Sequence, residues 1–131
     1  MASKPVKSSK TKQQFASTQN ELIVCDLEYS RVVEEMSDLE LDELEQFEET
    51  VEKVKKMTWE QVYKTSSKTQ KRGLNWEPIK GQATQSGKAI ASIRISRKFR
   101  ARVCRDRKIM RFISLHPVHD SAYDENGGEN I

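Results

Sequence analysis

Two histidines and a tyrosine stand close together near the C-terminus. They are His116, His119 and Tyr123, and the chain has no other histidine. Histidine suits proton transfer near neutral pH, because its ordinary pKa is about 6.5. A tyrosine ring can stack on an unpaired base or form a hydrogen bond beside a phosphate. The group predicts acid–base chemistry on an RNA phosphodiester; the alternative is a polar strand end closed by an aromatic side chain.

Basic side chains alternate with apolar ones in the segment before His116. Guanidinium groups held in this way suit phosphate oxygens and the charge that develops on a phosphate during cleavage. We therefore expect Arg100 to act in catalysis together with the two histidines and Tyr123. The candidates for binding RNA phosphates are Arg94, Arg97, Lys98, Arg102 and Arg111. The alternative for each of them is a solvated strand face.

Charge is divided along the chain, although the net charge is only +3. Residues 1–20 hold four lysines and no acid, and residues 21–60 hold 14 acids against four bases. Residues 61–111 then hold 15 bases against two acids, and residues 112–131 carry a net charge of −4. A concentrated positive field attracts phosphate backbones. The basic segment thus indicates RNA as a partner, whereas the acidic segment is typical of solvated helix faces.

Length and composition exclude several classes of protein. With 131 residues, 35% of them hydrophobic, the chain is long enough for one domain and has no apolar stretch that could span a membrane. The first residues contain no apolar segment of the secretory type, so we expect a cytoplasmic protein without membrane contact. Cys25 and Cys104 are then reduced. No C-x-x-C pair accompanies them or the histidines, so we expect no metal and no cofactor.

Hydrophobic spacing predicts a strand followed by helices in the first half. Residues 22–25 are a short β-branched run, and residues 29–36 have apolar side chains at helical spacing. The S-x-x-E sequence that begins at Ser37 has the form of a capping box. It predicts the start of a longer helix over residues 38–57. The same pattern at Thr58 predicts a short third helix.

The second half predicts an antiparallel meander. Residues 64–87 are polar, basic and dotted with glycine, which indicates a loop. Apolar side chains then recur at every second position over 91–95 and 99–103, and 109–115 is apolar enough for a central strand. Asp106 and Arg107 would form the hairpin tip. We therefore expect an α+β fold in which a helical hairpin packs on a small antiparallel sheet, whose other face keeps its arginines in solvent.

Composition also divides the chain into three parts. Residues 1–18 are basic and poor in apolar side chains, and are expected to be a flexible arm. Residues 19–123 would form the folded domain. Residues 124–131 are expected to be an acidic, disordered tail.

A helical hairpin followed by I-x-I-S-R-K-F-R-A-x-V, a hairpin tip, an apolar strand and a polar motif ending in tyrosine resembles the RelE/ParE toxin superfamily. The likeness covers about residues 20–123. Phe99-Arg100 corresponds to the basic strand of the family, and His116, His119 and Tyr123 correspond to its terminal motif. Two features depart from the family pattern: the basic arm, and histidine where some members have Arg or Lys.

The resemblance implies a toxin-like endoribonuclease of a toxin–antitoxin pair, which cleaves mRNA without metal on the ribosome and is inhibited by a cognate antitoxin protein. Other members of the superfamily act on DNA gyrase. The alternative for this chain is therefore a binding protein that keeps the fold and the basic surface but cleaves nothing, and that acts on gyrase, another replication protein or nucleic acid.

Overall fold

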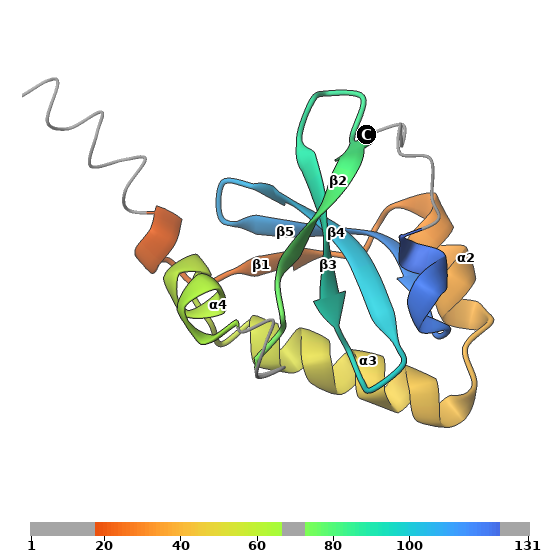
Figure 1. Cartoon of the computed structure of the whole chain (residues 1–131). Helices are drawn as coiled ribbons and strands as arrows, with labels where there is room; N and C mark the ends of the chain where they lie inside the picture. The colour runs from red at the N-terminus through yellow and green to blue at the C-terminus, as the bar shows by residue number, and fades with distance from the viewer. Residues whose placement is uncertain (1–17, 67–72, 124–131) are drawn as a thin grey trace, which may run out of the picture.

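The computed structural model describes residues 18–66 and 73–123, and it is an α+β structure with a five-stranded sheet (Figure 1). Strand β1 is followed by three helices, four further strands and a short 3-10 helix. The bounds are β1 Val24–Asp26, α2 Ser30–Ser37, α3 Leu41–Val54, α4 Trp59–Thr65, β2 Glu77–Ala83, β3 Ala89–Arg94, β4 Arg100–Asp106, β5 Ile109–His116 and η1 His119–Ala122.

The sheet is mixed, with strand order β1-β5-β4-β3-β2. Strands β3 to β5 form the expected antiparallel meander, to which β2 adds a further strand, and β4 turns into β5 at Arg107, which has a positive φ of 59°. Strand β1 pairs in parallel with β5, from Val24 opposite Ile109 to Asp26 opposite Arg111. The prediction of a purely antiparallel sheet was therefore wrong. The chain between β1 and β5 contains α2 to α4 and β2 to β4, so it is long enough for a parallel pairing.

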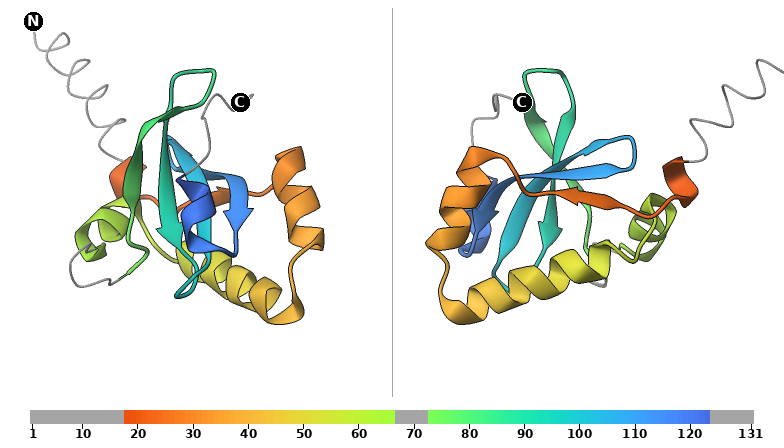
Figure 2. Two further views of the ribbon diagram at one scale, coloured as in Figure 1. Left: turned by 45° about the vertical axis from the view of Figure 1, so that its right-hand side comes forward. Right: turned by 180° about the vertical axis from the view of Figure 1, so that it is seen from behind.

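The prediction of a loop over residues 64–87 was wrong as well, because it contains β2. This strand lies at the sheet edge, where Pro78 removes no hydrogen bond that a neighbouring strand needs. Its register against β3 is interrupted between Pro78 and Ala83, a stretch that includes Gly81 at φ 82°. Proline and glycine thus mark an irregular edge strand. Figure 2 shows β2 and β3 extending beyond the other strands as a long hairpin.

The helices begin and end close to the predicted positions. Thr58 caps α4 as expected: its hydroxyl accepts from the backbone N–H of Gln61, whose side chain accepts from the backbone N–H of Thr58. The predicted cap at Ser37 was wrong, because Ser37 is the last residue of α2. Helix α3 is instead capped by Glu40, whose backbone N–H donates to the side chain of Glu43. A capping box is therefore present as predicted, but it begins at Glu40, three residues after Ser37.

The main core lies between the sheet and the helices. Helix α3 contributes Phe47, whose ring contacts Phe99 and, edge-on, Phe112. Val51 and Val54 of the same helix and Ile93 of β3 belong to this cluster. Figure 2 shows α3 lying against the sheet, and Phe47, Val51 and Val54 of its predicted apolar stripe are buried, whereas Leu41 at its start is exposed.

No helix in residues 18–66 or 73–123 is long and apolar enough to cross a membrane. The predicted tail, residues 124–131, lies outside the described residues, as does the predicted arm apart from Thr18.

Candidate functional site

The sheet face away from α3 carries most of the predicted site residues. Alternation along the strands places Arg94, Arg100 and His116 in one row, since Arg94 pairs with Arg100 and Arg100 pairs with His116. The next row across the same strands is Ser92, Arg102 and Ser114. Residues from three strands therefore meet on one face at adjacent levels.

A continuous chain of hydrogen bonds runs from Arg102 through His116 to the segment after β5. Nη1 of Arg102 donates to Oγ of Ser114 (3.0 Å), and this hydroxyl lies 2.7 Å from Nε2 of His116. On the other side, Nδ1 of His116 lies 2.7 Å from Oγ of Ser121, whose hydroxyl donates to the backbone oxygen of Val118. Arg102 also donates through Nε to Oε1 of Gln82 (2.9 Å).

The donors in this chain determine the tautomer of neutral His116. Because the Ser121 proton points to a carbonyl, Nδ1 of His116 must donate to Ser121. Because Ser114 accepts from Arg102, its own proton is available for Nε2 of His116. Both ring nitrogens are thus engaged, and the side chain is 3% exposed. The expectation that His116 exchanges protons with RNA is corrected by this enclosure; its side chain instead joins β5 to η1.

Two predicted phosphate ligands are held by other groups of the protein. Arg102 has no exposed surface, so a polynucleotide cannot reach it. Arg111 lies toward the other end of β5, where its Nε donates to Asp26 of β1 (2.9 Å) and its Nη1 lies 3.9 Å from Asp106. The prediction of a solvated arginine face failed because Gln82 and the segment that follows β5 cover the middle of the sheet.

Arg100 lies at the rim of the covered region and holds the β3–β4 turn. Its Nη1 donates to the backbone oxygens of Ser96 (2.8 Å), Phe99 (3.2 Å) and Arg97 (3.3 Å). Burial lowers the pKa of Arg100 below its ordinary value, and the charge of Arg94 acts in the same direction, whereas Tyr123 and Glu77 offset part of the effect. The guanidinium still carries its positive charge at neutral pH.

Tyr123 binds to an acid that the sequence analysis did not select. Its hydroxyl donates to Oε1 of Glu77 on β2 (2.9 Å) and lies 3.1 Å from Oγ of Ser92. Glu77 and Tyr123 are both half-buried, so solvent reaches them, in contrast to His116. The side chain of Arg100 interacts with both groups. A carboxylate and a phenol that solvent reaches therefore meet a guanidinium that is largely buried.

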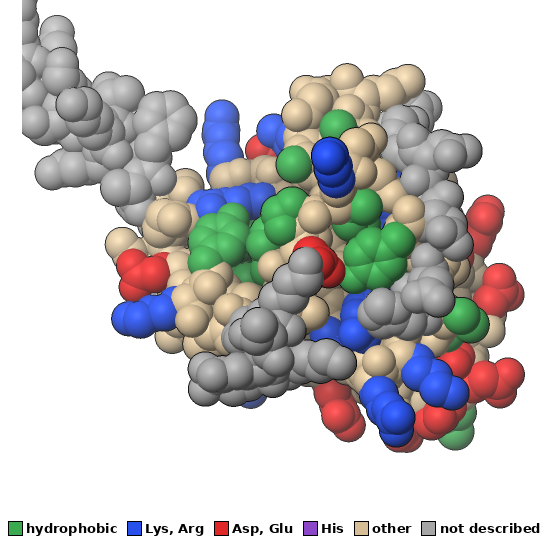
Figure 3. Space-filling view, in the orientation of Figure 1, with side chains coloured by type: hydrophobic (Ala, Val, Ile, Leu, Met, Phe, Trp, Pro, Cys, Tyr) green, Lys and Arg blue, Asp and Glu red, His purple; other side chains and the backbone are tan. Residues whose placement is uncertain are grey.

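The β3–β4 turn places two further predicted residues, Arg97 and Lys98, outside the sheet. Lys98 is exposed and Arg97 is half-buried. Figure 3 shows Lys and Arg side chains over the strands and this turn, and acidic side chains along the side of α2 and α3. For His119, η1 fixes the backbone, but its side chain lies outside what the structure describes.

Neither cysteine has the setting of a nucleophile or a metal ligand. Burial raises the pKa of the Cys25 thiol to about 11, and burial also raises the pKa of Cys104. Among the described residues, no group of three His, Cys, Asp or Glu side chains is arranged to hold a metal ion. These cysteines pack as small apolar residues.

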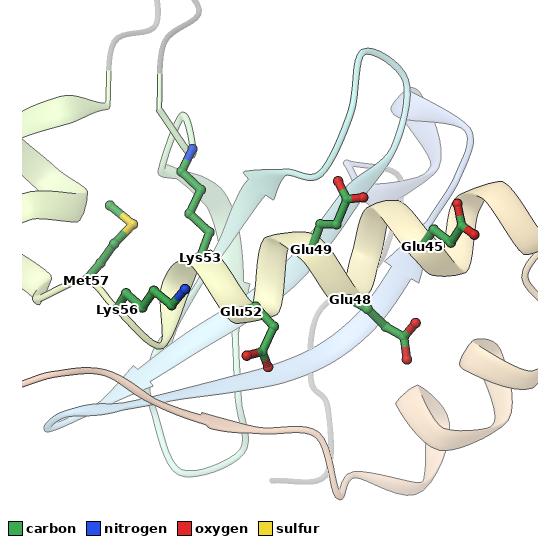
Figure 4. Close-up of a pocket in the computed structure, with 7 residues that line it drawn as sticks. All are labelled: Glu45, Glu48, Glu49, Glu52, Lys53, Lys56 and Met57. Atoms are coloured by element: carbon green, nitrogen blue, oxygen red, sulfur yellow. The ribbon is translucent and has the colours of Figure 1, made fainter.

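The outer side of α3 forms an open acidic groove with a volume of about 690 Å³ (Figure 4). Four glutamates spread along the helix, and Lys53, Lys56 and Met57 stand at its C-terminal end. These glutamates are Glu45, Glu48, Glu49 and Glu52. The groove would repel a polynucleotide, so the side of the protein suited to RNA is the one formed by the strands and the β3–β4 turn.

One signal in the sequence could have identified Glu77. It is one of only two acids among 15 bases in residues 61–111, and the other, Asp106, is at the β4–β5 hairpin. An isolated acid in a basic segment stands out once that segment is recognised as a strand. The structural roles of Gln82 and Ser114 had no comparable signal.

Comparisons of the chain with protein families, with curated proteins and with solved structures found no match.

Proposed function

We propose that this protein is a RelE/ParE-like toxin that binds RNA on the basic side of its sheet and cleaves it without a metal. The observation that carries the proposal is the hydrogen bond from Tyr123 to Glu77 beside Arg100, at a point that solvent reaches. The helical hairpin and Phe99-Arg100, at the start of the basic strand β4, support the family resemblance. In that family the partner would be a cognate antitoxin and the target mRNA on the ribosome.

The proposed reaction requires one proton to leave the 2′-hydroxyl and one to reach the 5′-oxygen. The Glu77 carboxylate takes the first proton as the 2′-oxygen bonds to phosphorus. The Tyr123 hydroxyl gives the second as the bond from phosphorus to the 5′-oxygen breaks. The hydrogen bond between the two side chains then returns a proton from Glu77 to Tyr123, so the pair is restored. Arg94 and Arg100 stabilise the negative charge on the phosphate.

The test is cleavage of a labelled single-stranded RNA by the purified full chain in the presence of a chelator. We expect Glu77→Gln to lower the cleavage rate by about 10² to 10⁴, the usual contribution of a positioned base. Tyr123→Phe should lower it similarly. Matched controls are Glu45→Gln on the exposed side of α3 and Tyr63→Phe on α4, with thermal unfolding to check the fold. Cleavage by Glu77→Gln at the parent rate would contradict the assignment.

A second candidate function is favoured by the enclosure of His116. If the protein binds RNA or another target without cleaving it, the hydrogen bonds from Arg102 through Ser114 to His116 are purely structural. The basic surface is then the whole functional site. In that case the parent binds RNA with a steep salt dependence but leaves it intact. Growth arrest on expression, with intact mRNA and damaged DNA, would favour action on gyrase.

A further inference from the structure

A hollow of about 390 Å³ lies between α3 and the β3–β4 turn, beside the proposed cleavage site. Four cationic side chains line it: Lys53 of α3, Arg94 of β3, Arg97 of the turn and Arg100 of β4. No acidic side chain is among its described lining residues. The remaining lining residues are Thr50, Gly73, Leu74, Ile95 and Ser96.

The charge in this hollow is concentrated and partly unsatisfied. Arg100 is 6% exposed, and its Nε is buried with no hydrogen-bond partner among the described groups. Leaving a buried donor on a charged group unpaired is unfavourable, so an acceptor supplied by a ligand would stabilise it. Among the described residues, neither Lys53 nor Arg97 forms an ion pair, although Lys53 also borders the acidic groove of α3 and Arg97 borders a second hollow with Asp42 and Glu43.

We infer that this hollow is a phosphate-binding site, in which Lys53, Arg97 and Arg100 hold one phosphate group. Its volume lies within the range of about 300–1,000 Å³ that is usual for small-ligand sites, so it can take a phosphate with part of its nucleotide. That this phosphate belongs to an RNA rests on the proposed function, in which Arg94 and Arg100 face the scissile phosphate of RNA. The hollow would then hold a second phosphate, either inside the strand or at its end.

The position of Lys53 connects the site to the longest helix. Lys53 is the one cation of the four that lies outside the strands and the turn, and Figure 4 shows it at the C-terminal end of α3, beyond the row of glutamates. Closing the site therefore depends on how α3 packs on the sheet. Gly73, another residue that lines the hollow, packs closely against the end of α4. It has a φ of 63°, and a Cβ there would lie 2.8 Å from the backbone oxygen of Thr65.

The first experiment uses inorganic phosphate as the probe and needs no RNA. We expect titration of the full chain to shift the backbone amide NMR signals of Ser96 and Arg97, and Lys53→Ala to abolish the shift. Lys56→Ala, which removes one charge from the end of α3 outside the hollow, should leave it intact. An absent phosphate response, or an equal response in Lys53→Ala and the parent, overturns the inference whether or not the protein cleaves RNA.

The second experiment measures binding of a labelled single-stranded RNA at several salt concentrations. Lys53→Ala and Arg97→Ala should each weaken binding about tenfold and lower the log–log salt slope by about 0.7, whereas Lys56→Ala should not. Tighter binding of a 5′-phosphorylated RNA than of its 5′-hydroxyl counterpart, lost in Lys53→Ala, identifies a terminal phosphate. Equal binding of the two RNAs, with the same loss in Lys53→Ala, identifies an internal phosphodiester.

Loss of cleavage in Glu77→Gln with an unchanged phosphate response would show that the cleavage site and the phosphate-binding hollow are distinct. Failure of the parent to bind RNA, with the phosphate response present, would reject the proposed function and keep the phosphate site. Equal RNA affinity for Lys53→Ala, Arg97→Ala and Lys56→Ala would overturn the inference.

Discussion

At the scale of single residues, Ser114 determines how two buried polar side chains fit together. Its hydroxyl accepts from Arg102 and lies within hydrogen-bond distance of His116, and all three residues are nearly or completely buried. A hydroxyl suits this position because it can accept and donate at once. The arrangement is structural, and the site accessible to solvent is the neighbouring pair Glu77 and Tyr123.

We predict that Ser114→Ala lowers the free energy of unfolding by about 1–3 kcal/mol, because it leaves buried groups on Arg102 and His116 without their partner. Urea unfolding measures this change. Ser37→Ala is the control, since the Ser37 hydroxyl donates to Glu34 at an exposed position on α2. A Ser114→Ala variant as stable as the control would show that the hydrogen-bonded chain contributes nothing to folding.

At the scale of elements, side chains help to attach the short strand β1 to β5. Strand β1 is three residues long and pairs only with the first part of β5. Asp26 accepts from Arg111 of β5 and from the backbone N–H of Glu28. Further along β5, where β1 has ended, Glu35 of α2 accepts from the backbone N–H of Leu115 (2.8 Å). Glu35 thus satisfies one backbone donor of β5 in the part that β1 does not cover.

We predict that Asp26→Asn makes the stability of the protein less dependent on pH on the acid side. Burial alone would raise the pKa of Asp26, but hydrogen bonds from Glu28 and Arg111 outweigh it and lower the pKa. The contribution of the pair is therefore present above the unfolded pKa of about 4 and is lost as pH falls through the lower folded pKa. The pair is partly exposed, so we expect about 0.2–1 kcal/mol.

Thermal midpoints of the parent and Asp26→Asn between pH 3 and pH 7 test this expectation. The parent should lose more stability than the variant as the pH falls. Glu28→Gln, two residues away at an exposed position, is the control and should follow the parent. Parallel curves for the parent and Asp26→Asn would show that the ion pair does not hold β1.

At the scale of the whole molecule, the protein presents an acidic side and a basic side. The glutamates lie along α3, and Figure 3 shows Lys and Arg side chains scattered around apolar side chains over the strands and near the β3–β4 turn. A polynucleotide would approach from the basic side and be repelled from the other, so the charge division fixes its orientation. The N-terminal segment, with four lysines, would add to the attraction.

We predict that deleting residues 1–17 leaves the thermal midpoint unchanged and weakens RNA binding. These residues hold few apolar side chains, so the core loses little without them. Thr18 is kept because its hydroxyl accepts from Arg105 (3.2 Å). The log–log salt slope of RNA binding should fall by about 0.7 for each lysine that contacted a phosphate. A lower thermal midpoint would show that Val6 or Phe15 packs against the domain.

The sequence alone determined the features that depend on local spacing. The apolar stripe of α3 placed Phe47 in the core, the pattern at Thr58 set the start of α4, and the alternation over 91–95 and 99–103 predicted β3 and β4. The basic segment was visible by counting charges. Each of these follows from side chains within a few residues of one another, and such spacing is fixed by the geometry of a helix or a strand.

Only the tertiary structure decided which side chains solvent can reach. Alternation placed Arg100, Arg102 and His116 on one face, but covering of that face depends on Gln82 and Ser121, which lie 20 and 5 residues away from the groups they bind. The parallel pairing of β1 with β5 joins residues 85 positions apart. Long-range contacts of this kind enclose His116 and bring Glu77 to Tyr123, because a polar group can be buried at little cost only where distant parts of the chain supply its hydrogen-bond partners.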